Sequence, residues 1–206
     1  MRVSPVRQPQ PVPCAGAVLA GGAGRRLGGG KAGVVVGGRP LLDHALQALG
    51  RVARPVAVVV RTDTVLPPLP VPPPLVWTED DGVRHPMAGV VHALERSVGS
   101  AVLVCAVDMP LMDPATLRVI LAGAALAPEA AVVVPLAGGH LQVLCALYRT
   151  VALAGLRDFD PDVRAADLVS ALRPAVIPFE DEIPFFNVNT PNDARRAEEL
   201  LRARGG

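Results

Sequence analysis

The sequence predicts an α/β fold in which helices cover a mostly parallel central sheet, and two observations carry this prediction. Short runs rich in valine and alanine alternate with longer amphipathic segments, which is the order of strands and helices in a parallel sheet. Runs such as VAVVV and AVLVCAV are apolar throughout, as strands buried on both faces are. With 206 residues, of which 50% are hydrophobic, the chain is long enough for one well-filled domain, which we expect over residues 14–206.

Periodicity, proline and glycine define the elements in the first half of the chain. Leu42, Ala45, Leu46 and Leu49 recur at helical spacing and predict one face of a helix. LPPLPVPPPL at 66–75 is too rich in proline for a helix or a central strand, so we expect an extended surface connection. The predicted order is strand 14–20, a glycine-rich loop, helix 40–52, strand 55–60, the proline-rich connection, a short strand at 75–77 and helix 87–98.

In the second half, Asp113 as N-cap and Pro114 at the first helical position predict the start of a helix. Thr190, Pro191 and Asp193 mark a second helix start, with Asp193 at the position of a capping-box acid. The predicted order is strand 101–107, helix 114–126, strands 130–135 and 141–148, helix 161–172, and FFNVNTPNDARRAEELLRAR as a strand followed by a helix.

Composition narrows the class of function. The formal net charge is +1 and no block of Lys and Arg occurs, so neither nucleic acid nor a membrane is expected as a partner. Residues 1–13 lack the apolar core of a signal peptide, and we expect a disordered tail there. Cys14, Cys105 and Cys145 lie in apolar settings and are odd in number, which favours buried thiols and a cytoplasmic location. A small-molecule ligand is therefore expected.

The stretch LAGGAGRRLGGGK, at 19–31, holds six glycines directly after the first predicted strand. A P-loop is excluded because Arg25 stands at its first glycine position and Ala32 replaces its hydroxyl residue. The dinucleotide pattern GxGxxG meets Leu27 at its third glycine. Two interpretations remain open: a loop whose amides approach a nucleotide while Arg25, Arg26 and Lys31 reach its phosphates, or a flexible hairpin with solvated cations.

One lysine favours the first interpretation. Lys31 is the only lysine in the chain, and the other nineteen basic residues are arginine. A lysine kept inside the glycine loop indicates a position that needs a compact ammonium group on a flexible stem instead of a planar guanidinium.

Acidic residues follow two of the predicted strands. Asp108 stands at the carboxyl end of strand 101–107, where open α/β sheets bind ligands, and Asp113 is better placed to cap the next helix. Asp108 is therefore a candidate ligand for Mg²⁺, which proteins hold with few carboxylates plus substrate phosphates. Glu79, Asp80 and Asp81 follow LVW, and they either supply a second acid to the same cleft or form a solvated turn.

Asn187 and Asn189 stand two positions apart in the final predicted strand, so they share one face while Val188 points to the other. Asparagine is depleted in strands, and two on one face favour hydrogen bonding to a polar ligand. Phe185 and Phe186 are expected in the core.

Five segments together resemble the molybdenum cofactor guanylyltransferases. They are VLAGGAGRRLGGGKAGVVVGGRPLLDHAL, HPMAG at 85–89, AVDMPLM, GHLQVLCALY and FFNVNTPNDA, in this order over roughly residues 14–200. The resemblance implies a Rossmann-like three-layer nucleotidyltransferase fold, with GTP, Mg²⁺ and molybdopterin as nucleotide, cofactor and acceptor. It also implies transient contact with cofactor-biosynthesis proteins or molybdoenzymes.

The resemblance further implies roles for single residues. Leu19, Ala20, Gly21, Gly22, Lys31, Asp80 and Asp108 would bind the nucleotide, Asp108 would ligate Mg²⁺, and Asn187 and Asn189 would face the acceptor. The reaction needs no general base, because the attacking phosphate oxygen is already ionised; Lys31, Arg25 and Asp108 are the candidate catalytic residues. His85 and His140 are accordingly given no role in proton transfer.

The chain departs from the family pattern at three positions. Gly30 stands where an acid usually precedes the loop lysine, His85 where a glycine precedes the proline, and Val143 where a proline follows Gln142. Three alternatives stay open: a cytidylyltransferase, a guanylyltransferase for another phosphorylated acceptor, and a nucleotide-binding regulator without turnover. The diglycine after Ala20 favours guanine, since cytidylyl relatives typically carry LAAG.

Overall fold

The structure, a computed structural model, describes residues 12–22, 30–79 and 82–205. Its centre is an eight-stranded sheet in the order β10-β7-β9-β6-β1-β4-β5, with β8 paired to β7. The strands are β1 (Ala15–Leu19), β4 (Val56–Val60), β5 (Leu75–Thr78), β6 (Ala101–Ala106), β7 (Val132–Ala137), β8 (His140–Leu141), β9 (Cys145–Arg149) and β10 (Ala175–Phe179).

The sheet is mostly parallel, as predicted. β6, β1, β4 and β5 pair in parallel, and so do β7 and β10. β9 runs antiparallel between β6 and β7, and the short β8 is antiparallel to β7. The carboxyl ends of β6, β1, β4 and β5 therefore meet at one edge of the sheet, in that order.

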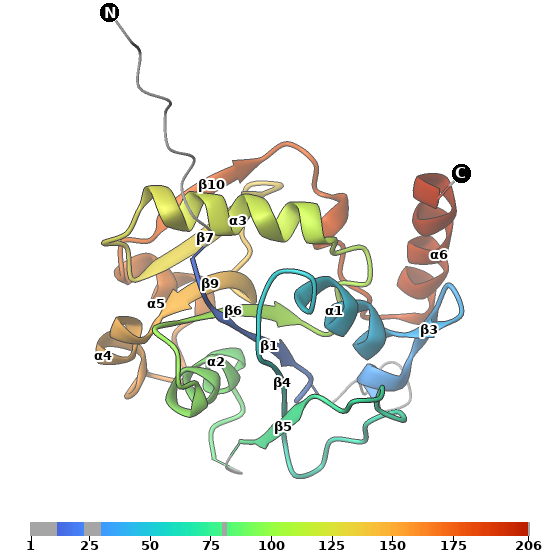
Figure 1. Ribbon diagram of the computed structural model, residues 1–206, viewed down its shortest axis with the longest axis horizontal. Helices are drawn as coiled ribbons and strands as arrows, with labels where there is room; N and C mark the ends of the chain where they lie inside the picture. The colour runs from blue at the N-terminus through green and yellow to red at the C-terminus, as the bar shows by residue number, and fades with distance from the viewer. Residues whose placement is uncertain (1–11, 23–29, 80–81, 206) are drawn as a thin grey trace, which may run out of the picture.

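Helices cover both faces of the sheet (Figure 1). The helices are α1 (Leu41–Leu49), α2 (Pro86–Arg96), α3 (Pro114–Leu126), α4 (Leu153–Leu156), α5 (Ala165–Ala171) and α6 (Pro191–Gly205), with short 3₁₀ turns at Lys31–Gly33, Thr150–Ala152 and Ile183–Phe185. Apolar side chains of α1, α3 and α6 join one core cluster, and those of α2, α4 and α5 join a second one. The two clusters lie on opposite faces because successive residues of β1, Ala17 and Val18, belong to different ones. The predicted α/β fold with three layers is confirmed.

Two helix starts follow the predicted capping chemistry. Asp113 Oδ1 accepts the Thr116 backbone N–H at 2.9 Å, and α3 spans the predicted residues 114–126. At α6, Thr190 Oγ1 accepts the Asp193 N–H while Asp193 Oδ2 accepts the Thr190 N–H at 2.8 Å. This reciprocal pair is a capping box, and a cap of this kind stabilises a helix by about 1 kcal/mol.

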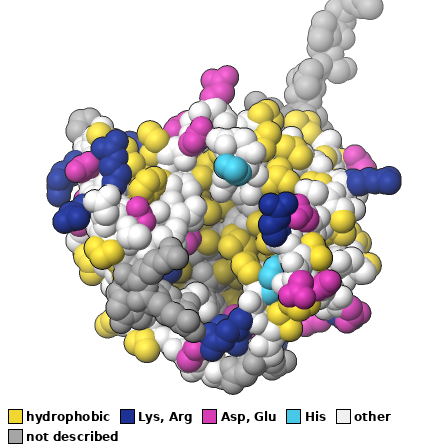
Figure 2. Space-filling view, turned by 180° about the vertical axis from the view of Figure 1, so that it is seen from behind, with side chains coloured by type: hydrophobic (Ala, Val, Ile, Leu, Met, Phe, Trp, Pro, Cys, Tyr) yellow, Lys and Arg dark blue, Asp and Glu magenta, His cyan; other side chains and the backbone are white. Residues whose placement is uncertain are grey.

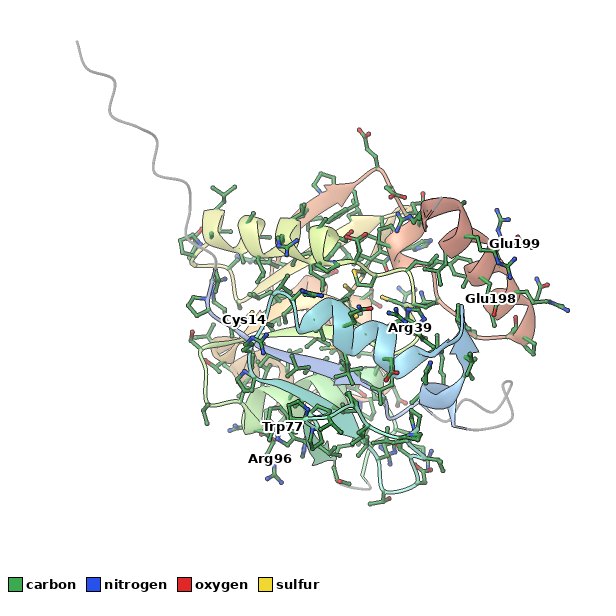
Figure 3. All side chains as sticks on the ribbon, turned by 45° about the vertical axis from the view of Figure 1, so that its right-hand side comes forward. Cys14, Arg39, Trp77, Arg96, Glu198 and Glu199 are labelled. Atoms are coloured by element: carbon green, nitrogen blue, oxygen red, sulfur yellow. The ribbon has the colours of Figure 1, made fainter. Side chains whose placement is uncertain are left out.

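A short hairpin, β2 (Val35–Val36) and β3 (Arg39–Pro40), lies between the glycine loop and α1. Its turn uses Gly37 and Gly38, both with positive φ, and the Gly37 N–H donates to Glu198 Oε1 of α6 at 3.3 Å. Figure 3 accordingly shows Arg39 and Glu198 on the same flank of the molecule. The hairpin was not predicted, because two-residue strands leave no periodic signal.

Two predicted strands need correction, and one strand of the sheet was not predicted. Residues 185–189 are not a strand: Ile183–Phe185 form a 3₁₀ turn, and the following segment crosses the end of β6 instead of pairing along it, with a single backbone bond from Val188 to Asp108. Strand 141–148 begins only at Cys145, because Gln142 closes a turn by accepting the Cys145 N–H. β10 was not predicted, because proline is rare in strands and Pro178 interrupts the apolar run. Proline is tolerated here because β10 is an edge strand.

Helix 161–172 also differs from its predicted range, because residues 161–164 form a turn and α5 begins at Ala165. The proline-rich connection contains neither helix nor strand before β5, as expected. Phe185 is buried and Phe186 packs partly against the same core, which confirms both as core residues.

The remaining expectations concern the ends and the cysteines. The tail prediction at 1–13 falls mostly outside the described residues, and Val12 packs partly against the core. The division into a tail and one domain over 14–206 stays a prediction. Cys14, Cys105 and Cys145 are buried and form no disulfide. None of the helices in the described part of the chain has the length and hydrophobicity that a bilayer crossing requires.

Candidate active site

A cleft of about 370 Å³ opens at the carboxyl ends of β6, β1, β4 and β5. Its floor is apolar, with Leu19, Val59, Val107 and Leu144, and polar and charged side chains stand around it. The face drawn in Figure 2 is hollowed at its centre, with hydrophobic side chains inside and basic, acidic and histidine side chains at the rim. An apolar floor with a few polar groups at a parallel sheet's carboxyl edge is typical of a ligand site.

The first wall of the cleft is the end of β1. Leu19, Gly21 and Gly22, three of the expected nucleotide contacts, line the cleft. Ala20 instead is buried among the core residues on the α1 face, and its N–H donates to the Val59 carbonyl oxygen at 2.8 Å. Gly89 of α2 lets that helix approach, because a Cβ there would stand 3.2 Å from a methyl carbon of Leu19.

Lys31 reaches the opposite end of the cleft. Its Nζ donates to Asp108 Oδ2 at 2.6 Å and to Asn189 Oδ1 at 2.7 Å. The ion pair is largely buried, with the Lys31 and Asp108 side chains 12% and 17% exposed. Gly30, just before the lysine, has φ of 61°, a left-handed conformation that glycine adopts without strain. The glycine that replaces the usual acid at this position therefore suits the left-handed backbone conformation.

Two backbone N–H groups hold residues 186–189 in place, one bonded to the segment after β6 and the other to the first turn of α6. The Val188 N–H donates to the Asp108 carbonyl oxygen at 2.9 Å, and the Asn189 N–H donates to Asp193 Oδ2 at 2.9 Å. The bond from the Asn189 N–H, together with those from Thr190, holds the pKa of Asp193 below its usual value, since these bonds favour the ionised carboxylate. Val188 is buried while Asn187 and Asn189 are exposed, so the predicted alternation of faces holds although no strand forms.

Asp108 fits the predicted metal site. Its second oxygen, Oδ1, is buried and has no hydrogen-bond partner among the described residues. A buried carboxylate oxygen without a partner is costly unless a cation or donor completes it. Among the described residues, no three His, Cys, Asp or Glu side chains form a cluster. Proteins commonly hold Mg²⁺ through one or two carboxylates, with substrate phosphates and water as the other ligands, so a single carboxylate such as Asp108 suits this ion.

Two charged side chains form the far wall of the cleft, and both are buried. Arg61 follows β4 and is 7% exposed; Glu79 follows β5 and is 8% exposed. Burial raises the pKa of Glu79, and the charge of Arg61 opposes that rise. Arg61 was missed by the sequence analysis, although its position at a strand's carboxyl end is the signal that identified Asp108.

The other two departures from the family pattern have structural roles. His85 Nδ1 accepts the Met87 N–H and caps α2, which leaves Nε2–H to donate to the Val163 carbonyl oxygen at 3.1 Å. Val143 is buried, and its carbonyl oxygen accepts the Tyr148 hydroxyl at 2.6 Å.

Thus Leu19, Gly21, Gly22, Lys31 and Asp108 line one cleft, with Asn189 bonded to Lys31. Asn187 is exposed and donates to the Phe185 carbonyl oxygen. Arg25, Arg26, Asp80 and Asp81 lie outside the described residues.

Comparison with known proteins identifies the family. The family model of the MobA-like NTP transferase domain matches residues 16–176. A protein of Cereibacter sphaeroides named molybdenum cofactor guanylyltransferase is 34% identical over 201 residues, covering 91% of this chain and 96% of its own. A probable molybdenum cofactor guanylyltransferase of Mycobacterium tuberculosis is 36% identical over 197 residues, covering 88% and 92%. Families of this kind typically use a divalent metal.

Solved structures agree on the fold. Molybdopterin-guanine dinucleotide biosynthesis protein A from Archaeoglobus fulgidus superposes with a TM-score of 0.71 at 23% identity, covering 92% of this chain and 99% of that one. A 2-C-methyl-D-erythritol 4-phosphate cytidylyltransferase from Thermus thermophilus superposes at 0.67 and 24% identity, covering 93% and 100%. The fold thus occurs with more than one nucleotide base. With the matching family model and these relatives, the chain belongs to the MobA-like NTP transferases and is a nucleotidyltransferase.

Proposed function

We propose that this protein transfers GMP from GTP to molybdopterin, forming the guanine dinucleotide form of the molybdenum cofactor and releasing pyrophosphate. The observation that carries the proposal is the Lys31–Asp108 pair at the end of a nucleotide-sized cleft. Relatives at 34% and 36% identity carry the name molybdenum cofactor guanylyltransferase.

The proposed chemistry is an in-line displacement. An oxygen of the acceptor's phosphate attacks the α-phosphorus of GTP, a new P–O bond forms, and the bond to the β-phosphate oxygen breaks. Negative charge develops on the transferred group and on pyrophosphate, and the ammonium group of Lys31 would neutralise that charge; its position beside Asp108 supports this role. No side chain needs to accept a proton, because the attacking oxygen is ionised at neutral pH. Positioning and electrostatic stabilisation therefore account for catalysis.

Asp108 would hold Mg²⁺ through its unpartnered Oδ1. When bound, Mg²⁺ supplies Lewis-acid polarisation of the phosphate oxygens. Lys31 has an alternative partner in Asn189, so its ammonium group stays oriented toward the cleft when the charge of Asp108 is shared.

The remaining assignments rest on the sequence pattern. Asn187 and Asn189 would face the acceptor, and the exposure of both side chains and the bond from Lys31 to Asn189 support this. Arg25 would contact phosphates and Asp80 would help to hold the nucleotide. The three buried, unpaired thiols support a cytoplasmic location, where molybdenum-cofactor proteins or molybdoenzymes would be transient partners.

Thermal protection tests the choice of nucleotide. A ligand that binds only the native state stabilises it by RT ln(1 + [L]/Kd), so GTP with Mg²⁺ should raise the Tm more than CTP or ATP does at equal concentration. Protection by CTP equal to that by GTP would contradict the guanine assignment and favour a cytidylyltransferase. A pyrophosphate-release assay with molybdopterin then separates an enzyme from a nucleotide-binding regulator, which would bind GTP without turnover.

A further inference from the structure

The cleft runs along the carboxyl ends of four neighbouring strands, and the segment after each strand contributes one residue to the cleft wall. Asp108 follows β6, Gly21 follows β1, Arg61 follows β4 and Glu79 follows β5. Neighbouring strands are about 4.8 Å apart, so the span from β6 to β5 is roughly 14 Å. A nucleoside triphosphate in an extended conformation covers such a span. With its phosphates at Asp108, its base would reach the wall formed by Arg61 and Glu79.

That wall holds a polar atom that the described part of the protein does not satisfy. Arg61 and Glu79 are the only charged residues in the described part of the chain that are buried. Arg61 Nε is buried without a hydrogen-bond partner there, and burial raises the pKa of the neighbouring Glu79. Leaving Arg61 Nε unpaired costs folding free energy, and burial disfavours the charge of Glu79, so a ligand that pairs with both groups is the physical explanation that we adopt.

On the basis of the proposed function, we infer that Glu79 is the residue that selects guanine. The Watson–Crick edge of guanine presents two adjacent donors, N1–H and the 2-amino group, which match the two oxygens of one carboxylate. Cytosine and adenine present a ring-nitrogen lone pair at the corresponding position, which a carboxylate repels. Arg61 supplies the complementary donor in the same wall, for the O6 acceptor of guanine.

Gly21 is the steric partner of this carboxylate. A Cβ at position 21 would stand 2.5 Å from Glu79 Oε1 and 2.9 Å from Cγ of Arg61. Any side chain at this position would therefore displace the carboxylate. Glycine at position 21 thus leaves the room in which the Glu79 carboxylate lies.

The test compares GTP with inosine triphosphate, which lacks only the 2-amino group. Equilibrium binding in the presence of Mg²⁺ is measured by calorimetry for the wild-type protein, Glu79→Gln, and the control Glu129→Gln, an exposed acid on the loop before β7 at the opposite edge of the sheet. The wild type and the control should bind GTP about tenfold or more tightly than inosine triphosphate, since a hydrogen bond to a charged group is at stake. In Glu79→Gln the preference should fall to about threefold or less.

Gly21→Ala provides a second variant, because it moves the carboxylate without removing it, and it should lower the same preference. A GTP preference that persists in Glu79→Gln would overturn the inference and leave the proposed function intact, provided that the wild type transfers GMP. Tighter binding of CTP than of GTP by the wild type would overturn the proposed function and the inference together. Circular dichroism of each variant verifies that the fold is kept.

Discussion

Lys31 and Asp108 are 77 positions apart in the chain, yet Lys31 Nζ lies 2.6 Å from Asp108 Oδ2. The pair joins the glycine loop after β1 to the end of β6, two strands that are neighbours in the sheet. Each charge is the counterion of the other in a site that excludes much of the solvent. A change that keeps the charge should therefore affect mainly the chemistry, whereas loss of one charge should also destabilise the fold.

Replacing Lys31 with arginine keeps the charge but changes its shape. Lys31 Nζ bonds to oxygens of both Asp108 and Asn189, a geometry that suits a compact ammonium group. We expect kcat for GMP transfer to fall at least about tenfold in Lys31→Arg, equivalent to about 1.4 kcal/mol of transition-state stabilisation. Arg118→Lys, an exposed exchange on α3, is the matched control. Wild-type turnover in Lys31→Arg would mean that the lone lysine is accidental.

Asp108→Asn tests the metal ligand. Asparagine is nearly isosteric and still accepts a hydrogen bond from Lys31, so the fold should be kept, although the Tm without ligand should fall because Lys31 loses its counterion. It removes the charge that would hold Mg²⁺, so GMP transfer across a Mg²⁺ titration should collapse. Asp113→Asn serves as control, because asparagine caps α3 about as well as aspartate does. Normal turnover of Asp108→Asn at limiting Mg²⁺ would place the metal elsewhere.

The two exposed asparagines should respond differently to alanine. Asn189 contacts Lys31 directly, whereas Asn187 contacts only the Phe185 carbonyl oxygen. We expect Asn187→Ala to raise the KM for the acceptor about fivefold, the value of one neutral hydrogen bond, with little change in kcat. Asn189→Ala should raise the same KM and also lower kcat. Steady-state kinetics with varied acceptor decides, and an unchanged acceptor KM in both variants would remove the asparagines from the acceptor site.

Glu79 should make the ligand-free protein less stable as the pH rises. Its pKa is raised by burial, so between its ordinary value and the raised one the folded state binds more protons than the unfolded state does. The free energy of unfolding therefore falls as the pH rises through this window. The charge of Arg61 lowers the pKa of Glu79 and so reduces this fall, whereas the negative charge of the exposed Asp63 raises the pKa further. Arg84 and His85 also line this cleft, and Glu79→Gln leaves both unchanged, so the difference between variant and wild type reports on Glu79 alone. Urea unfolding should show Glu79→Gln gaining stability over the wild type from about pH 4 to neutral pH; a constant difference would contradict this.

Local signals in the sequence predicted the fold well where one short stretch decides the structure. The N-cap Asp113 and Pro114 fixed the start of α3, and the Thr190–Asp193 box fixed the start of α6. The final predicted strand failed because an extended segment becomes a strand only beside a free partner. Residues 186–189 instead meet the end of β6.

The site was predictable only in part, for a related reason. Glycines, a lone lysine and an acid after a strand are visible one by one, so Lys31 and Asp108 were identified as candidates. Their direct contact was not predicted, because it depends on which strands are neighbours. Arg61 was missed because arginine after a strand ordinarily reaches solvent, and only the fold shows that Glu79 and Gly21 enclose it.

The connection between β4 and β5 is unusual in its composition. Parallel neighbours are usually joined through a helix, whereas this link contains six prolines within 66–75 and no helix. Proline restricts the unfolded chain as well as the folded one, so ordering this link costs less conformational entropy than ordering the same length of other residues. Each proline also lacks an N–H that would need a partner, and Leu66 and Leu69 anchor the link to the core. Covalent ring geometry thus replaces a hydrogen-bonded helix in the crossover that leads to Glu79.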